Sequence, residues 1–364
     1  MIKGMSIETL RHFVAWATAV SQSAGLMESM QRALQAQPNT TAFVDAVREH
    51  CTRRKKEPDW QAADDALAWA GATDCELVPF YSALYPPLLR HIQAPPPLLY
   101  ARGNVALLSA AQLAVVGSRK ASSAARRFAH ALSSDLVGAG FAVTSGLAIG
   151  IDAAAHRGAL AAQGGTIAVL GNGIDRIYPR NHAELYESIS ADGLLISEFS
   201  LRAPPKPHHF PRRNRLISGL SLGTVVVEAS ERSGSMATAL HAVNQGREVF
   251  AVPGDIRNPL SRGCHKLLKD GAKLTESVDD VLDEIQFLPQ LRGASLPVQK
   301  PEPMMSLSPD AVKLLDHCGW APFSVEEVVS WIQCDAKRVA AQLTHLEVSG
   351  FIEATVDGRF QRAR

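Results

Sequence analysis

The sequence predicts an α/β protein: a Rossmann-like, doubly wound, mostly parallel sheet with an N-terminal helical domain and a C-terminal winged-helix domain. Three observations predict this arrangement. Short apolar runs alternate with helical stretches through the middle of the chain, a proline-rich linker follows, and helix-capping and hairpin signals come last. The predicted division is a helical domain over residues 1–72, the sheet domain over 73–286, the linker over 287–305 and the winged helix over 306–364.

The composition is that of a globular protein. The 364 residues are 46% hydrophobic and 20% charged, which is enough to build a sizeable core. No apolar run approaches the roughly 20 residues that span a bilayer. The first residues lack a basic segment followed by an apolar one, so we expect no membrane anchor and no signal peptide. The five cysteines form no CxxC pair, which predicts a reducing cytoplasm without a disulfide framework or zinc site.

The first domain reads as short helices. Leu10, Phe13, Val14 and Ala17 recur at the spacing of one helix face. Four consecutive cations at residues 53–56 indicate a loop or a helix end. A turn-rich segment follows and ends in the prolines at 95–97.

The middle region alternates between strand and helix. Fully apolar short strands separated by helices, such as those expected over 122–137 and 151–162, are typical of a parallel sheet covered on both faces. The predicted strands occupy residues 113–117, 142–146, 166–171, 194–198, 224–229 and 248–254. This alternation predicts the doubly wound sheet.

The last region carries the signals of a small helical unit with a hairpin. Ser308-Pro309 is an N-cap followed by proline at the first helical position, and Ser324 with Glu327 forms a capping box. Asp357-Gly358 signals a tight hairpin. The apolar positions of two further helices are Val325, Val328, Val329 and Ile332, then Val339, Leu343 and Leu346. Helices followed by a hairpin are the order of a winged helix.

Positive charge gathers in the middle of the chain, although the whole carries only +1. Residues 1–75 carry a net charge of −1, residues 76–274 carry +8 and residues 306–364 carry −2. Between Phe199 and Val227 there are five cations and no acid. Such a block is either a surface for a polyanion or a solvated basic loop, and charge alone favours the loop.

The candidate site is the set of loops at the carboxyl ends of the predicted strands, where ligands of open parallel sheets lie. In Gly117-Ser118-Arg119, the glycine lets a ligand approach the backbone and the arginine can hold a phosphate through two hydrogen bonds. Ser233-Gly234-Ser235 precedes a helix and would offer backbone N–H groups to an anion. The other loops at this edge are 144–152, 171–173 and 253–255. A glycine needed for a turn explains any single loop more simply, but several loops at one edge favour a phosphate ligand.

Residues 210–217 combine an aromatic ring, three guanidinium groups and an amide. Arginines such as Arg213 and Arg215 can hold phosphates, Phe210 can stack on an unpaired base, and Asn214 can bond a base edge or a sugar. Because a duplex hides its base faces, this mixture favours a single strand. The alternative is that Phe210 belongs to the core and Asn214 shapes a turn, and the residues alone do not separate the two.

Common enzyme signatures are absent from the sequence. It contains no GxxxxGK[ST], no GxGxxG after the first predicted strand and no GxSxG at the end of a predicted strand. Asp152 and His156 could form an acid–base pair or ligate a metal, but a helix-start aspartate and a packed histidine are favoured. His208-His209 and Cys264-His265 lack the spacing of metal ligands. We therefore expect no metal and no cofactor.

Many of these motifs resemble the DNA-processing protein A family, also called DprA or Smf. The resemblance is dense over about residues 75–285, and the C-terminal region is similar to the winged helix of some members. The first 70 residues match loosely the sterile-alpha-motif-like helical domain that many members carry. The segments that carry the resemblance are 116–119, 143–156, 165–173, 178–179, 197–198, 210–217, 227–229, 233–235, 251–254 and 271–274.

The resemblance implies a cytoplasmic protein without catalytic turnover. Such proteins bind incoming single-stranded DNA during natural transformation, protect it and load the RecA recombinase on it. The resemblance also implies a homodimer, formed here through His265, Leu268 and Leu274. The DNA-binding residues that it implies are Ser118, Arg119, Gly146, Phe210, Arg213, Asn214, Arg215, Ser233 and Gly234. The region of charge +8 contains all of them, which agrees with this function independently.

Two other functions stay open from the sequence. One is a nucleotide-processing enzyme of the phosphoribohydrolase type, in which Glu228 or Glu198 would act at a ribose carbon. The other is a transcriptional regulator that binds duplex DNA through the winged helix. The acidic winged helix is either a protein-contact module or a weak duplex binder that uses Arg359, Arg362 and Arg364, and we favour the protein contact.

Overall fold

The computed structural model describes residues 6–19, 26, 29–30, 32, 40–285, 314, 323–332, 335–348, 351–355 and 359–362. They belong to two compact units, one within residues 1–300 and one within 301–364, and each is described by itself. The predicted linker over 287–305, the N-cap at Ser308-Pro309 and the turn at Asp357-Gly358 lie outside the described residues. No helix in the described part of the chain is long and apolar enough to cross a membrane.

The first unit begins with helices α1 (Ile7–Ala19), α3 (Thr40–Arg53) and α4 (Trp60–Ala70). The predicted apolar face of α1 is buried in the hydrophobic core. The ring of Phe43 stacks on that of Phe80, which follows the first strand of the sheet, and their centroids lie 5.7 Å apart. The helices therefore share one hydrophobic cluster with the edge of the sheet. The domain boundary between residues 72 and 73 stays a prediction.

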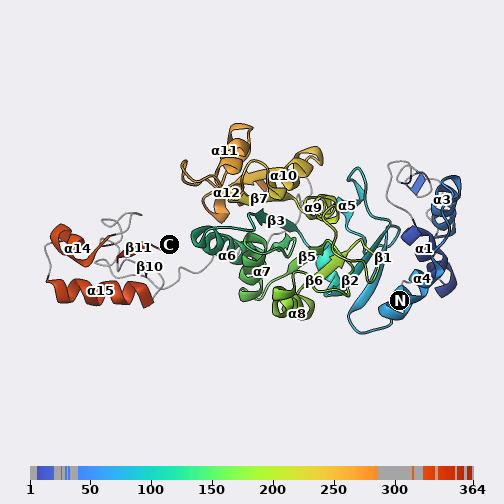
Figure 1. Ribbon diagram of the computed structural model, residues 1–364, viewed down its shortest axis with the longest axis horizontal. Coiled ribbons are helices and arrows are strands. Elements are labelled where there is room, and N and C mark those ends of the chain that lie inside the picture. The colour runs from blue at the N-terminus through green and yellow to red at the C-terminus, as the bar shows by residue number, and fades with distance from the viewer. Residues whose placement is uncertain are drawn as a thin grey trace. The chain divides into compact units, whose positions relative to one another are not determined.

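Within the described residues, the first unit contains one nine-stranded sheet in the order β1-β2-β6-β5-β4-β3-β7-β8-β9 (Figure 1). The pairs β1–β2 and β2–β6 are antiparallel, and all other neighbours are parallel. The strands are β1 (Cys75–Pro79), β2 (Leu98–Gly103), β3 (Gln112–Gly117), β4 (Ala142–Ser145), β5 (Thr166–Leu170), β6 (Leu194–Ser197), β7 (Gly223–Val227), β8 (Glu248–Ala251) and β9 (Lys273–Leu274). Because β3 to β8 coincide with the six predicted apolar runs, the doubly wound, mostly parallel sheet is confirmed.

Helices cover both faces of this sheet. Alternate residues of β3 enter different cores: Leu113 and Val115 pack with α6 (Ser123–Gly138) and α7 (Ile151–Ala161). The intervening residues of β3 pack with α9 (His209–Leu220) and α10 (Gly234–Asn244) on the other side. A strand buried on both faces is apolar throughout, which explains why β3 reads as a continuous hydrophobic run. The other helical segments are α5 (Pro87–Arg90), η1 (Val105–Ser109), η2 (Arg180–His182), α8 (Ala183–Asp192), α11 (Arg262–Lys269) and α12 (Val278–Ile285).

The winding direction of the chain reverses beside β3. From β3 the chain runs outward through β4, β5 and β6, and then returns to β7 on the other side of β3. The helices that follow β3 and β7, α6 and α10, pack on opposite faces. The loop from β3 to α6 and the loop from β7 to α10 therefore diverge at the carboxyl ends of these two strands. Open α/β sheets bind ligands at such a place.

The second unit contains α14 (Val325–Ile332), α15 (Ala336–Val348) and the antiparallel strands β10 (Ile352–Ala354) and β11 (Phe360–Arg362). The predicted capping box is confirmed. The backbone N–H of Glu327 donates to Ser324 Oγ at 3.2 Å, and the N–H of Ser324 donates to Glu327 Oε2 at 2.8 Å. The small core of this unit is made by Leu314, Phe323, Val328, Val339, Leu343, Leu346 and Ile352.

Candidate functional site

A pocket lies beyond the carboxyl ends of β3, β4 and β5, beside the point where the winding reverses. The loops after these three strands form most of its wall, and the first turns of α9 close it. Of the nine predicted DNA-binding residues, Arg119, Gly146, Phe210 and Arg213 line it. Its full lining is Arg119, Gly146, Leu147, Ala148, Ile149, Leu170, Gly171, Asn172, Tyr178, Pro179, Phe210 and Arg213.

Arg213 is buried at the base of this pocket, with 3% of its surface exposed. Its Nη1 donates to the carbonyl oxygen of Gly146 at 2.8 Å and to that of Val169, and its Nε donates to Asn214 Oδ1 at 3.3 Å. Burial lowers the pKa of Arg213 to about 10, which still leaves it charged at neutral pH. The pocket therefore contains a permanent positive charge that backbone carbonyls hold in place.

Gly146 is required for this arrangement of Arg213. A Cβ atom at Gly146 would lie 2.6 Å from Arg213 Nη2 and 2.8 Å from Asp152 Oδ2. Contacts this short do not occur in folded proteins, so a side chain here would displace the guanidinium or the carboxylate. Glycine is thus needed here because two side chains approach the backbone closely at the end of β4, and not only because the chain turns.

Phe210 lies within cation–π distance of two arginines at the pocket wall. The Cζ atom of Arg119 is 5.5 Å and that of Arg213 is 6.0 Å from the centroid of its ring. The ring of Tyr178, which is 40% exposed, lies 5.5 Å from the same ring. Guanidinium groups over an aromatic face gain cation–π energy, and the same surfaces accept a phosphate and a base face. Arg119 is exposed, whereas Phe210 is half-buried.

The loop after β4 is fixed by Asp152, in the first turn of α7. Asp152 Oδ2 accepts the N–H of Gly146 at 3.1 Å and that of Ala148 at 3.3 Å. Leu147 between them has a φ of +55°, in the left-handed region. Burial raises the pKa of Asp152, and the nearby charge of Arg213 opposes that shift. The carboxylate therefore organises backbone that lines the pocket.

His156, one turn after Asp152, makes different contacts. Its side chain is completely buried, and its Nδ1 lies 2.7 Å from Thr166 Oγ1, which itself donates to the carbonyl oxygen of Val143. Burial lowers the pKa of His156 to about 3, so the ring is neutral at physiological pH. Asp152 and His156 thus have separate partners, as expected for a helix-start aspartate and a packed histidine. No group of three potential metal ligands occurs among the described residues.

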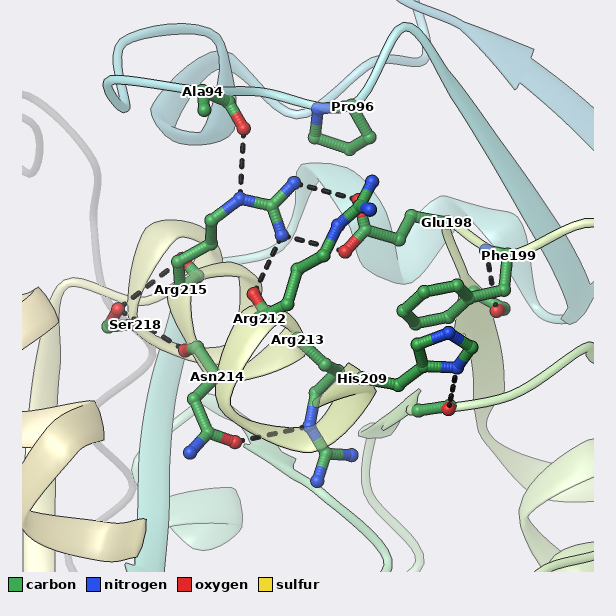
Figure 2. Close-up of polar contacts among 12 residues, drawn as sticks. Ala94, Pro96, Glu198, Phe199, His209, Arg212, Arg213, Asn214, Arg215 and Ser218 are labelled. Carbon is green, nitrogen blue, oxygen red and sulfur yellow. Dashed lines mark hydrogen bonds and ion pairs between the residues drawn. The ribbon is translucent and has the colours of Figure 1, made fainter. Parts of the chain in front are cut away.

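Arg215 lies on the side of α9 that faces away from the pocket. Its Nη1 and Nη2 each donate to one carboxylate oxygen of Glu198 at 2.7 Å, and its Nε donates to the carbonyl oxygen of Ala94 at 3.0 Å. Figure 2 shows Arg212 and Arg215 directed to Glu198, with Arg213 and Asn214 on the opposite side. Burial opposes ionisation of Glu198, but the hydrogen bonds and charges of Arg215 and Arg212 together outweigh it and lower the pKa. The structure therefore places Arg215 apart from the four lining residues.

The remaining predicted DNA-binding residues lie beside the pocket without lining it. Asn214 Nδ2 donates to the carbonyl oxygen of Gly234 at 3.2 Å, which connects Arg213 to the start of α10. Ser233 is the N-cap residue of α10, but its side chain makes no capping hydrogen bond. The N–H of Ser118 donates to the carbonyl oxygen of Glu228 at 2.7 Å. Asn214, Ser233, Gly234 and Ser118 thus form a second group next to the pocket.

Glu228, one of the two glutamates considered as catalytic, connects the loops at this edge. Its Oε2 accepts the N–H of Ser122 at 2.7 Å, and its Oε1 accepts Nδ2 of Asn258 at 3.0 Å. Its φ of +53° is unusual for a residue with a side chain. Both strand-end glutamates, Glu198 and Glu228, are therefore engaged in holding the fold.

The three predicted dimer residues lie on α11 and β9. Leu274 is 44% exposed, and Leu268 packs partly against the core. His265 Nε2 lies 3.0 Å from the carbonyl oxygen of Gly254. Ile256 is 80% exposed and lines the same concavity as His265. The structure thus provides exposed apolar surface near two of the three residues.

The predicted DNA-binding residues do not include several residues of the lining, above all Tyr178 and Ile149. Both follow strands at the predicted ligand edge, which is the one signal that could have identified them. Their side chains are large and apolar, and such residues are usually assigned to a core. Here they are 40% exposed at the pocket.

Comparison with known proteins identifies the two units. The sequence model described as DNA recombination-mediator protein A matches residues 76–286, and that described as the DprA winged helix domain matches residues 298–358. The chain is 41% identical to Protein Smf of Escherichia coli over 84% of its own length and 82% of the relative's. It is 45% identical to DNA processing protein DprA of Streptococcus pneumoniae over 56% of its own length and 72% of the relative's.

Solved structures agree with these matches. A structure of DNA processing protein A from Streptococcus pneumoniae superposes with a TM-score of 0.65 and 32% identity, covering 76% of this chain and 99% of the other. A Helicobacter pylori structure of the same protein, which concerns its single-stranded DNA binding mode, superposes with a TM-score of 0.53 and 27% identity. It covers 58% of this chain and 95% of the other. The chain belongs to the DNA recombination-mediator protein A (DprA/Smf) family.

Proposed function

We propose that this protein is a recombination mediator that binds single-stranded DNA in the pocket beyond β3, β4 and β5. The observation that carries the proposal is the cation–π cluster of Arg119, Phe210 and Arg213 at the wall of that pocket. Two guanidinium groups supply charge for a phosphate backbone, and Phe210 and Tyr178 supply ring faces for a base.

The pocket favours a single strand over a duplex for a physical reason. Base faces are accessible in a single strand, whereas stacking and pairing hide them in a duplex. The pocket is a concavity at the carboxyl ends of the parallel strands. The net charge of +8 over residues 76–274 adds attraction that does not depend on sequence. The Helicobacter pylori relative, described for its single-stranded DNA binding mode, supports this ligand.

Membership of the family supports a more specific proposal for the protein's role. The protein protects incoming DNA during natural transformation, loads RecA on it and works in the cytoplasm. It acts as a homodimer through the region of His265, Leu268 and Leu274, where Leu274 and Ile256 expose apolar surface. A direct test is the rate of RecA filament assembly on a short single strand, with the wild-type protein and with Arg213→Met. The proposal expects acceleration by the wild type only, and no acceleration by either would contradict it.

A non-catalytic role is supported by the surroundings of the carboxylates. None of the described residues that line the pocket is an aspartate or a glutamate. Glu198 is held by Arg215, and Glu228 by Ser122 and Asn258. The alternative, a phosphoribohydrolase, needs a carboxylate at a ribose carbon. Release of free base from nucleoside monophosphates, abolished by Glu228→Gln, would establish the alternative and overturn this part of the proposal.

The winged helix is proposed as a protein-contact module. Arg359, one of three cations considered for duplex binding, directs Nη2 to both carboxylate oxygens of Glu327, at 2.7 and 2.9 Å. This ion pair connects the start of β11 to α14. The guanidinium of Arg359 is therefore already bound to a carboxylate. Arg364 lies outside the described residues. Sequence-specific duplex binding by residues 306–364 alone would instead favour a regulator.

A further inference from the structure

A buried carboxylate lies next to the cations of the pocket. Asp152 is 7% exposed, and its Oδ2 accepts the N–H groups of Gly146 and Ala148, two residues of the lining. The point where a Cβ of Gly146 would lie is 2.8 Å from Asp152 Oδ2 and 2.6 Å from Arg213 Nη2. The carboxylate and the guanidinium thus flank one glycine at the base of a site for anions.

The charge of Asp152 acts on both pocket arginines. Burial raises the pKa of Asp152, while Arg213 and Arg119 lower it through their charges. In return, Asp152 raises the pKa of Arg213 against the effect of burial. The negative charge of Asp152 also repels any phosphate that Arg213 attracts. Water screens this repulsion only partly, because Asp152 and Arg213 lie in a site partly shielded from it.

Loop geometry alone does not require a charge here. Two backbone N–H groups can be accepted by a neutral amide oxygen as well as by a carboxylate oxygen. An ionised side chain that is nine-tenths buried carries a desolvation penalty that a neutral one avoids. The start of α7 and the nearby Arg213 both favour the ionised carboxylate, and its charge in turn acts on the arginines of the pocket.

We propose that Asp152 limits the affinity of the pocket for single-stranded DNA, so that the strand is released to the next protein. This inference rests on the proposed function and deepens it. Arg213, held by backbone carbonyls, attracts the phosphate, and Asp152 offsets part of that attraction. Asp152 is a positioning and charge-balancing residue, since it acts through Arg213 and the loop and does not line the pocket itself.

The test separates the charge of Asp152 from its hydrogen bonds. Asp152→Asn keeps an oxygen that can accept from Gly146 and Ala148 but removes the charge. Asp152→Ala removes both. The matched control is Asp192→Asn, because Asp192 is exposed at the end of α8, which leads into the start of β6 at the opposite edge of the sheet. Affinity and dissociation rate are measured with a labelled oligothymidylate, by anisotropy and by stopped-flow competition.

The proposal expects Asp152→Asn to bind the strand about three- to tenfold more tightly, the effect of one charge about 6 Å from a phosphate at a dielectric of about 40–80. Dissociation slows by a similar factor. Asp152→Ala weakens binding because the loop loses its support, and Asp192→Asn changes little. A merely structural Asp152 would give equal or weaker binding in Asp152→Asn, which overturns the inference. Absence of strand binding by the wild type would instead overturn the proposed function itself.

Discussion

Arg213 Nη1 donates a hydrogen bond of 2.8 Å to the carbonyl oxygen of Gly146, which connects the first turns of α9 to the end of β4. The bond crosses 67 positions of the sequence. The bond holds the Arg213 guanidinium where the loops after β3, β4 and β5 meet. We expect a substitution of either residue to break it. Several expected outcomes derive from this relationship and from the contacts around it.

Replacement of Arg213 removes the buried charge of the pocket. We expect Arg213→Met to weaken single-strand binding about 10- to 150-fold, since a hydrogen bond to a charged group contributes about 1.5–3 kcal/mol. The slope of log affinity against log salt should flatten by about 1. Arg212→Met is the matched control, because Arg212 is directed to Glu198 and not to the pocket. Equal losses in the two variants would show that the pocket is misplaced.

A methyl group at Gly146 tests the same contact from the other side. We expect Gly146→Ala to displace Arg213 or Asp152, since its Cβ would lie 2.6 Å from Arg213 Nη2. Strand affinity should fall at least about tenfold, as for loss of the arginine contact. Gly138→Ala is the control, because no atom lies within 4 Å of its Cβ position. Unchanged binding by Gly146→Ala in an anisotropy titration would contradict this role of the glycine.

The buried ion pair of Arg215 and Glu198 is expected to stabilise the fold and not to bind the strand. The Glu198 side chain is completely buried and that of Arg215 is 10% exposed. Removing one partner of such a pair costs about 3–5 kcal/mol, because the other charge stays buried. Glu198→Gln should therefore lower the unfolding midpoint in urea markedly. Asp64→Asn, which breaks the exposed pair with Arg11, should cost less than about 1 kcal/mol.

Stability should depend on pH through His156. The pKa of this ring is about 3 in the folded protein because of burial, against 6.5 ordinarily. Between these values the unfolded chain binds a proton that the folded protein does not, so the free energy of unfolding falls as the pH falls below 6.5. Each pH unit contributes about 1.4 kcal/mol, which amounts to about 2 kcal/mol by pH 5.

The measurement for His156 is urea denaturation at a series of pH values. His156→Asn keeps a donor for Thr166 but cannot titrate, so its stability should change less between pH 6.5 and 5 than that of the wild type. The difference between the two proteins isolates His156 from the other histidines. Parallel pH profiles would mean that the ring is protonated in the fold.

The parallel part of the sheet could be predicted because its strands are buried on both faces. β3 to β8 are mostly apolar; β3, β4 and β6 end in glycine or serine, and a glycine follows β5 directly. β1 and β2 were not predicted. They lie between clusters of turn residues, and β2 follows three prolines, so local composition hides strands that pair antiparallel at the edge.

Residue type is enough to anticipate which candidate residues meet at the pocket, whereas helix geometry decides which of them lie elsewhere. Arg119, Phe210 and Arg213 are at the pocket as expected. Arg215 is two positions after Arg213 on α9, which turns it by about 200° around the helix axis. It therefore lies with Arg212, three positions earlier, beside Glu198. The helix thus divides the basic segment between a pocket and a buried ion pair.

The central claim is that the pocket of Arg119, Phe210 and Arg213 binds single-stranded DNA. The most direct test is fluorescence anisotropy of the full chain with a labelled single strand and a matched duplex, over a series of salt concentrations. We expect a strong preference for the single strand and a steep negative slope of log affinity against log salt, both reduced in Arg213→Met. Equal or negligible affinity for the two DNAs would contradict it.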